Sequence, residues 1–221
     1  MTDLHPHGAI HLPRLVATTL VEQLRADLAP FPLDRPGLRL RGVTAVAALL
    51  APDGAMGQAA AALIGPRAMP VRALLFDKSS ARNWAVGWHQ DRVIAVKQRL
   101  EVSGFGPWSV KEGVIHVAPP VEILRGMVTL RLHLDPVGTE NAPLLYAPGS
   151  HRLGIVPVGQ VPEFVERCGV ETSLAQAGDA WAYSTLILHA SEPALSPDRR
   201  RVLHVDYAAC SLPGGLEWLG I

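Results

Sequence analysis

The sequence predicts a mainly β protein with flanking α-helices, in which a barrel or sandwich follows a helical first third. Three observations lead to this expectation. Helical periodicity runs through the first 70 residues, and short Val-, Ile- and Leu-rich runs alternate with turn residues after Val71. The chain of 221 residues is also 48% hydrophobic, which is enough for a sizeable core. Many short runs with frequent turn signals are typical of barrels and sandwiches.

A single domain is expected over residues 1–221, with mainly helical support over 1–70 and the β core over 71–210. Apolar residues at helical spacing predict a helix over Leu15–Leu28, which prolines between residues 30 and 36 terminate. A second helix is expected from about Val43 to Leu50. A third, Ala55–Ile64, ends at Gly65-Pro66, a common helix stop.

Seven strands are expected in the second part of the chain, because each run is bounded by turn-forming residues. They are Val71–Phe76, His89–Val96, Val114–Val117, Met127–Leu134, Leu144–Ala147, Gly178–Leu188 and Arg201–Ala208. The segment Gly104–Ser109 combines glycines with aromatic residues, and we expect it to be a mobile cover over a site. The N-terminal segment that carries His5, His7 and His11 is expected to be a flexible tail.

Two of these strands separate polar from apolar side chains. Residues alternate across a strand, so Thr129, Arg131 and His133 share one face, opposite leucines. On the last strand, His204 and Asp206 share a face in the same way. Such polar faces either meet water or line an internal cavity. We favour a cavity, because Arg and His opposite a continuous leucine face suit a space that holds an anion and a metal.

Composition and charge narrow the compartment and the partners. The 20 basic and 20 acidic residues balance, and no run of Lys or Arg suggests nucleic acid or an anionic membrane. No apolar run approaches the length of a bilayer span, and no signal peptide is visible. Cys168 and Cys210 are expected to be free thiols. We therefore expect a cytoplasmic protein with a small-molecule substrate, whose oligomeric state the sequence does not reveal.

The strongest local motif is Trp88-His89-Gln90-Asp91. On a strand, His89 and Asp91 point to the same face, where an imidazole and a carboxylate can reach one metal ion. Two histidines and one carboxylate with open positions are typical of non-haem Fe(II) oxygenases. A lone His-x-Asp is common by chance, but His189 supplies a second histidine about a hundred residues later. The expected iron ligands, and catalytic residues, are His89, Asp91 and His189.

Arg200 follows His189 by eleven residues, an interval typical of 2-oxoglutarate dioxygenases. That cosubstrate chelates iron at its keto-acid end, and its far carboxylate needs a cation, for which the planar guanidinium is well suited. Strand parity favours Arg200 over Arg199 and Arg201, because it puts Arg200 on the polar face. Ser191 can add a hydroxyl donor to the same carboxylate.

The stretch from Val71 to Ala208 resembles the phytanoyl-CoA dioxygenase (PhyH) superfamily. The matching segments occur in the expected order: Trp88-His89-Gln90-Asp91, Leu134-Asp135…Asn141…Leu144, Pro148-Gly149-Ser150-His151, Gly178-Asp179, and His189-Ala190-Ser191 followed by Arg200. The resemblance implies a double-stranded β-helix (jelly-roll) core, ferrous iron, 2-oxoglutarate and O2. It assigns iron to His89, Asp91 and His189. Because the carboxylate ligand is present, hydroxylation is favoured over halogenation. Asn141-Ala142 departs from the Asn-Gly that is frequent in the family.

Further residues are candidates for contacts in the same site. Gln90, Lys78 and Trp108 are candidates for the cosubstrate. For the substrate the candidates are Arg131, His133, Asn83 and Trp88.

The expected function is hydroxylation of a C–H bond in a polar small molecule. Two alternatives remain open. One is a cupin-like metalloenzyme that does not use 2-oxoglutarate, and the other is a catalytically silent binding protein on the same fold.

Overall fold

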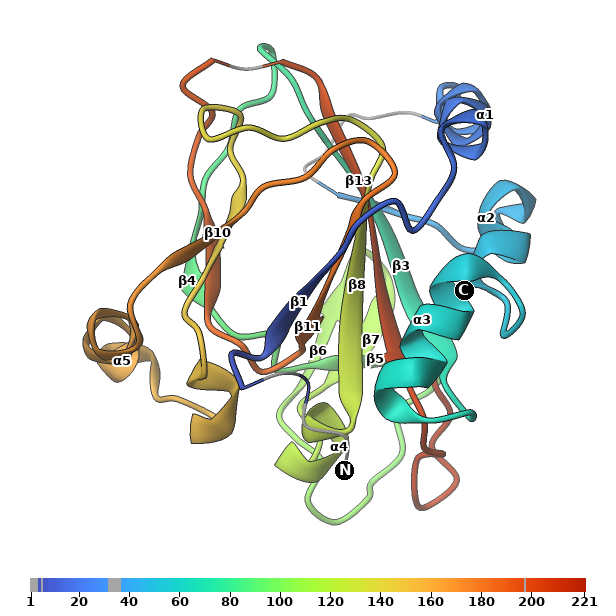
Figure 1. The fold of residues 1–221 in the computed structure, drawn as a ribbon. Helices are drawn as coiled ribbons and strands as arrows, with labels where there is room; N and C mark the ends of the chain where they lie inside the picture. Colours follow the sequence, from blue (N-terminus) through green and yellow to red (C-terminus); the bar gives the residue numbers. More distant parts are fainter. Residues whose placement is uncertain (1–3, 5, 32–36, 197) are drawn as a thin grey trace.

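Two antiparallel β-sheets face each other in the computed structural model, which describes residues 4, 6–31, 37–196 and 198–221 (Figure 1). The six-stranded sheet has the order β1 (Ala9–Leu12), β11 (Ala180–Ser184), β8 (Met127–His133), β13 (Arg200–Ala208), β3 (Met69–Lys78) and β2 (Leu38–Arg39). The four-stranded sheet has the order β10 (Glu171–Ser173), β9 (Leu144–Tyr146), β12 (His189–Ser191) and β4 (Val86–His89). This arrangement is a jelly-roll, as expected.

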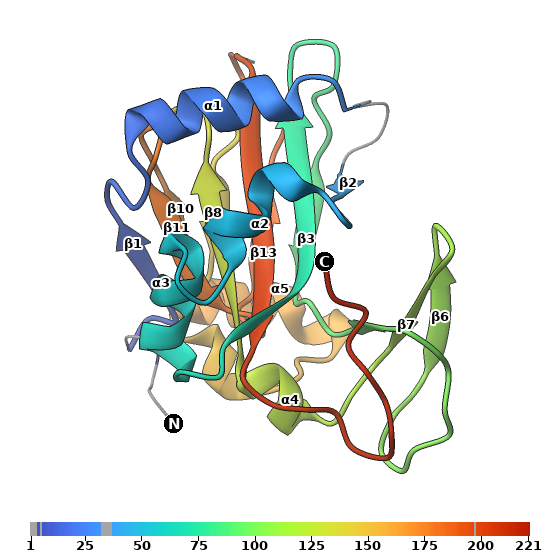
Figure 2. The ribbon, with the colours of Figure 1, turned by 90° about the vertical axis from the view of Figure 1, so that its right-hand side faces the viewer.

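A smaller sheet of three strands extends from the body of the molecule, with the order β5 (Ile94–Val96), β7 (Val114–Val117) and β6 (Trp108–Lys111) (Figure 2). Short helices connect the strands: α4 (Val121–Arg125), the 3₁₀ turns η1 (Ser150–Leu153) and η2 (Val158–Gln160), and α5 (Val161–Cys168). Among the described residues no single helix is long and apolar enough to cross a bilayer. By length and composition alone, α2 (Thr44–Leu50) and α3 (Ala55–Ile64) could cross one only as a pair, which is bent by 41°.

The N-terminal helices cover the outer face of the six-stranded sheet (Figure 2). These are α1 (Thr18–Leu28), α2 (Thr44–Leu50) and α3 (Ala55–Ile64), close to the expected helices. Leu24 and Met56 from the helices share one buried cluster with Leu130 and Leu132 from β8. Burying one such side chain contributes about 1.5–3 kcal/mol, so this layer fixes which face of each strand turns inward.

Four expectations about the elements were wrong. The strand expected over His89–Val96 is split, because β4 ends at His89 and β5 begins at Ile94. The strand expected to reach Leu188 ends at Ser184. Part of the expected mobile cover, from Trp108, forms β6 and pairs with β7. The expected N-terminal tail instead supplies β1, in which His11 pairs with Trp181 and bonds to Asp179, while His5 lies outside the described residues.

Candidate active site

Strand register assembles a polar inner face on the six-stranded sheet. Arg200 on β13 lies opposite Lys78 on β3. His204 lies between Arg131 on β8 and Leu74 on β3. Asp206 lies one step further along, between Thr129 on β8 and Arg72 on β3. The polar side chains that alternate with leucines in the sequence therefore face inward, as the cavity interpretation expected.

The four-stranded sheet supplies two histidines from directly paired positions. His189 on β12 lies opposite His89 on β4, and their ring centroids are 4.3 Å apart at a tilt of 52°. Nδ1 of His89 is 2.8 Å from the Gly87 carbonyl, and Nδ1 of His189 is 3.0 Å from the Ile187 carbonyl. Because a carbonyl oxygen only accepts, each Nδ1 carries the proton of its bond, and in the neutral form of the ring Nε2 then keeps its lone pair.

Burial lowers the pKa of His189 to about 4, although the Asp91 carboxylate acts in the opposite direction. The imidazole is therefore neutral at pH 7. A neutral ring with its proton on Nδ1 has the form that a metal-ligating histidine takes, with the second nitrogen anchored by a hydrogen bond.

Asp91 follows the end of β4, where the strand ladder no longer holds the backbone. Its Oδ2 lies 3.4 Å from Nη2 of Arg72, whose Nε donates at 2.5 Å to Asp206. Asp206 also accepts from Thr129 at 2.8 Å and lies 3.2 Å from Nε2 of His204. Burial alone would raise the pKa of Asp91, but Arg72 and then His189 outweigh it and lower the pKa. Asp91 is thus held as a carboxylate.

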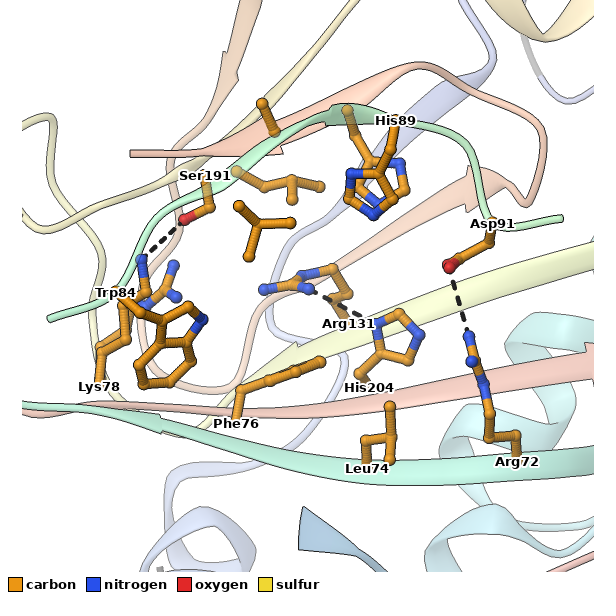
Figure 3. A pocket seen from close by; sticks show the side chains of 15 residues that line it. Arg72, Leu74, Phe76, Lys78, Trp84, His89, Asp91, Arg131, Ser191 and His204 are labelled. Atoms are coloured by element: carbon orange, nitrogen blue, oxygen red, sulfur yellow. Dashed lines mark hydrogen bonds and ion pairs between the residues drawn. The ribbon is translucent and has the colours of Figure 1, made fainter. Parts of the chain in front are cut away.

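A cavity of about 570 Å³, counted out to open solvent, lies between the two sheets (Figure 3). The three expected iron ligands line one part of it. Its apolar wall includes Leu74, Phe76 and Leu144. A largely apolar concave site with a few convergent polar groups is typical of small-molecule sites.

The other end of the cavity is cationic. Nζ of Lys78 donates to Oγ of Ser191 at 3.0 Å and to the Glu192 carbonyl at 2.9 Å, while Arg200 donates to the Ala142 carbonyl. Lys78 and Arg200 are each 2% exposed, and neither pairs with a described acidic side chain. Burial, then Arg200 and Arg131, lower the pKa of Lys78 to about 7. Burial and Arg131 lower the pKa of Arg200 to about 9, so it stays charged at neutral pH.

Of the two candidate substrate residues on β8, only Arg131 lines the cavity. His133 is buried, and neither of its ring nitrogens has a hydrogen-bond partner among the described residues. Burial, then Arg131 and Arg200, lower the pKa of His133 to about 3, so its imidazole is neutral.

Four other candidates lie outside the cavity, contrary to expectation. The Gln90 amide bonds to the backbone of Gly154, Val156 and Leu186, so it ties loops together. The Asn83 amide bonds to both backbone groups of Ala194. Trp88 packs on the apolar cluster beside α5. Trp108 packs on the cluster under the three-stranded sheet. Strand alternation explains Trp88, because the residue next to His89 points to the other face.

The sequence reasoning missed Arg72, Leu74 and Phe76, which line the cavity from β3. The signal was present in the alternation along this strand. Val71, Ala73 and Leu75 are buried in apolar clusters, while the residues between them face inward and lead to Lys78.

In the types of donor that they offer, though not in their present spacing, the residues fit an iron ion. Two imidazoles offer Nε2, and Asp91 has one oxygen turned to Arg72 and another not engaged by it. This donor set is the one that non-haem Fe(II) prefers. As they stand, no three His, Cys, Asp or Glu side chains of the described residues form a group that would hold a metal.

Comparisons with known proteins agree with this fold. The family model for phytanoyl-CoA dioxygenase (PhyH) matches residues 4–202. AviO1 from Streptomyces viridochromogenes has a TM-score of 0.64 at 20% identity, and the match covers 97% of each chain. EctD from S. alaskensis, solved with 2-oxoglutarate and 5-hydroxyectoine, has a TM-score of 0.69 at 17% identity over 93% of this chain and 73% of its own.

A third similar structure is the non-haem α-ketoglutarate-dependent carbocyclase SnoK from nogalamycin biosynthesis, with a TM-score of 0.65 at 17% identity. That match covers 94% of this chain and 82% of SnoK. No curated protein sequence matches the chain. Because the family model spans most of the sequence, the chain belongs to the phytanoyl-CoA dioxygenase (PhyH) family of Fe(II)- and 2-oxoglutarate-dependent oxygenases.

Proposed function

We propose that this protein is an Fe(II)- and 2-oxoglutarate-dependent dioxygenase that hydroxylates a C–H bond of a polar small molecule. The proposal rests on one observation, which is that the two ends of one cavity carry different chemical groups. Two Nε2-presenting histidines and Asp91 lie in one part, and buried cations with no acidic partner among the described residues lie at the other end. A 2-oxo dicarboxylate has matching ends, one that chelates a metal and one that needs a cation.

In this proposal His89, Asp91 and His189 hold the iron, and Arg72 holds the second oxygen of Asp91. Iron and 2-oxoglutarate together supply the activation of O2 and the oxidation of the C–H bond, with release of succinate and CO2. The backbone carbonyls behind each Nδ1 keep both imidazoles in the ligating tautomer. The orientation of both imidazoles is thus set before any metal binds, while the three ligands do not yet form a metal-holding group.

Arg200, Lys78 and Ser191 bind the far carboxylate of 2-oxoglutarate. Arg200 keeps its position through the Ala142 carbonyl, and Lys78 through Ser191 and Glu192. Charge-assisted hydrogen bonds to a carboxylate are about twice as strong as neutral ones, and burial strengthens them further. EctD, which was solved with 2-oxoglutarate, shares the fold and supports this use of the cavity.

The apolar wall formed by Leu74, Phe76 and Leu144 offers no hydrogen bonds to water beside the reacting groups. The apolar walls with a few convergent polar groups suit a small molecule, whereas a macromolecule would have to present a single side chain or base to the cavity. The hydroxylation outcome follows from Asp91, because all three protein ligand positions are filled and none is left open to a halide.

Turnover with oxygen tests the proposal. Purified protein with Fe(II), 2-oxoglutarate and ascorbate should form succinate slowly in air even without substrate. His189→Ala should abolish this succinate, and Arg200→Gln should raise the 2-oxoglutarate concentration that is required. Succinate formation that survives Arg200→Gln unchanged would contradict the assigned anchor. Iron binding without any succinate would favour a metalloenzyme that does not use 2-oxoglutarate.

A further inference from the structure

The cavity contains more positive charge than iron and 2-oxoglutarate would balance. Its four lining cations are Arg72, Lys78, Arg131 and Arg200, and the carboxylates that contact them are Asp91 and Asp206. Two positive charges therefore remain, counting the histidines as neutral. Fe(II) adds two charges and the 2-oxoglutarate dianion removes two, so the excess persists. If Lys78 gave up its proton, one positive charge would still remain.

Of the four cations, Arg131 has the weakest partners, so the uncompensated positive charge of the cavity is assigned to it. Lys78 donates to two oxygens, Arg200 to a carbonyl, and Arg72 to two carboxylates. The neighbours of Arg131 are neutral: Nδ1 of His204 at 3.5 Å, the hydroxyl of Tyr183, and the face of Phe76, whose centroid is 5.5 Å away. Its Nε has no hydrogen-bond partner, and it forms no ion pair with a described acidic side chain.

Arg131 is also placed to meet a ligand. It is 6% exposed and rises from β8, the strand whose opposite face packs on the helices. Figure 3 shows it between the Lys78–Ser191 end of the cavity and His204, below His89. A buried guanidinium without an anion is costly, so a site of this kind is completed by a ligand.

We propose that the substrate is an acid whose carboxylate-type group binds Arg131, while its apolar part lies against Phe76 and Leu74. The inference rests on the proposed function, because the charge count assumes that iron and 2-oxoglutarate occupy the same cavity. It narrows the substrate class from polar small molecules to anionic ones. Phe76 contributes by orienting the guanidinium plane, since cations stack on aromatic faces.

The test uses pairs of acids and their neutral amides, such as phenylacetate with phenylacetamide and hexanoate with hexanamide. Each is titrated without oxygen into the Fe(II)·2-oxoglutarate complex, and the visible charge-transfer band is followed. In the wild type each acid should perturb the band at a concentration at least about 10-fold lower than its amide, as expected for a charge-assisted bond. Arg131→Met should remove this preference, and Arg131→Lys should keep part of it.

Two results would overturn the inference. One is a wild type that binds acids no better than amides. The other is an Arg131→Met variant that loses affinity for 2-oxoglutarate itself, which would assign Arg131 to the cosubstrate. Absence of the band in the wild type would instead contradict the proposed function. In that case the affinities of the protein for the acids and their amides would be compared by calorimetry, which does not need the band. Arg167→Met, at a residue 65% exposed in its side chain, is the matched control for removing an arginine.

Discussion

At the scale of single residues, the site is organised by groups that hold the expected ligands from behind. Backbone carbonyls fix both imidazoles, and Arg72 fixes Asp91. The sequence placed the expected ligands and Arg200 in one site because their chemistry and spacing are specific, and all four line one cavity. Arg72 was missed, although the alternation along β3 places it on the cavity face, because an arginine in an apolar run is usually a surface charge. Gln90 and Trp108 were misplaced, because proximity to a motif says little about the direction of a side chain.

Arg72→Met should weaken Fe(II) binding by about 10- to 100-fold, the usual effect of losing a group that orients a metal ligand. The reason is that Asp91 lies beyond the end of β4, where its hydrogen-bond partner is Arg72. A competition titration with a coloured chelator measures this affinity. Arg167→Met is the control, and unchanged iron affinity in Arg72→Met would show that the contact does not position Asp91.

Lys78 should make 2-oxoglutarate binding depend on pH. Burial, Arg200 and Arg131 lower its pKa to about 7, so the free protein loses this proton as pH rises through 7. Binding of a carboxylate favours the charged ammonium, so the affinity should be higher below pH 7 and fall above it. Calorimetry in buffers of different ionisation enthalpy should detect proton uptake on binding. Proton uptake should be absent in Lys78→Met. Proton uptake that persists in this variant would show that another group takes up the proton.

At the scale of elements, strand positions followed from periodicity and turn residues, while their ends did not. β13, β8 and β3 were expected nearly as observed, because each has one continuous apolar face. The break after His89 was missed, because the run up to Val96 reads as one strand. Its residues divide between two sheets, and tertiary pairing decides this.

Asp135 should be a stabilising link between elements. It accepts from the backbone and guanidinium of Arg201 at 2.8 Å, and lies 3.1 Å from Arg25 on α1. Asp135→Asn should lower the free energy of unfolding by about 2–4 kcal/mol, because it leaves two partly buried arginines without their counter-charge. Urea denaturation measures the change. Glu122→Gln, at an exposed ion pair, should change stability by less than about 0.5 kcal/mol. Equal effects of the two variants would contradict this role.

At the scale of the whole molecule, the helical layer and the jelly-roll share one apolar cluster. The sequence indicated both parts and their order along the chain. It did not show that the cavity lies between two sheets, because this depends on pairings between strands far apart in sequence, such as His89 with His189.

We predict that the helices and the jelly-roll unfold together, as one domain. Leu24→Ala on α1 removes a side chain that is 1% exposed, and should cost about 2–5 kcal/mol. Helical signal and iron binding should be lost at the same, lower urea concentration. Leu20→Ala on the same helix, at a residue 41% exposed, should change little. Two separate transitions would show that residues 1–70 form an independent unit.

The central claim is that one cavity binds iron at one end and 2-oxoglutarate across to the other. The most direct measurement is an anaerobic titration of the Fe(II)-loaded protein with 2-oxoglutarate, followed by visible absorption. A saturable charge-transfer band is predicted in the wild type. Arg200→Gln should give a band at the same wavelength, but it should need a higher concentration of 2-oxoglutarate to saturate. Iron that binds with full stoichiometry, without any band at saturating 2-oxoglutarate, would contradict the account.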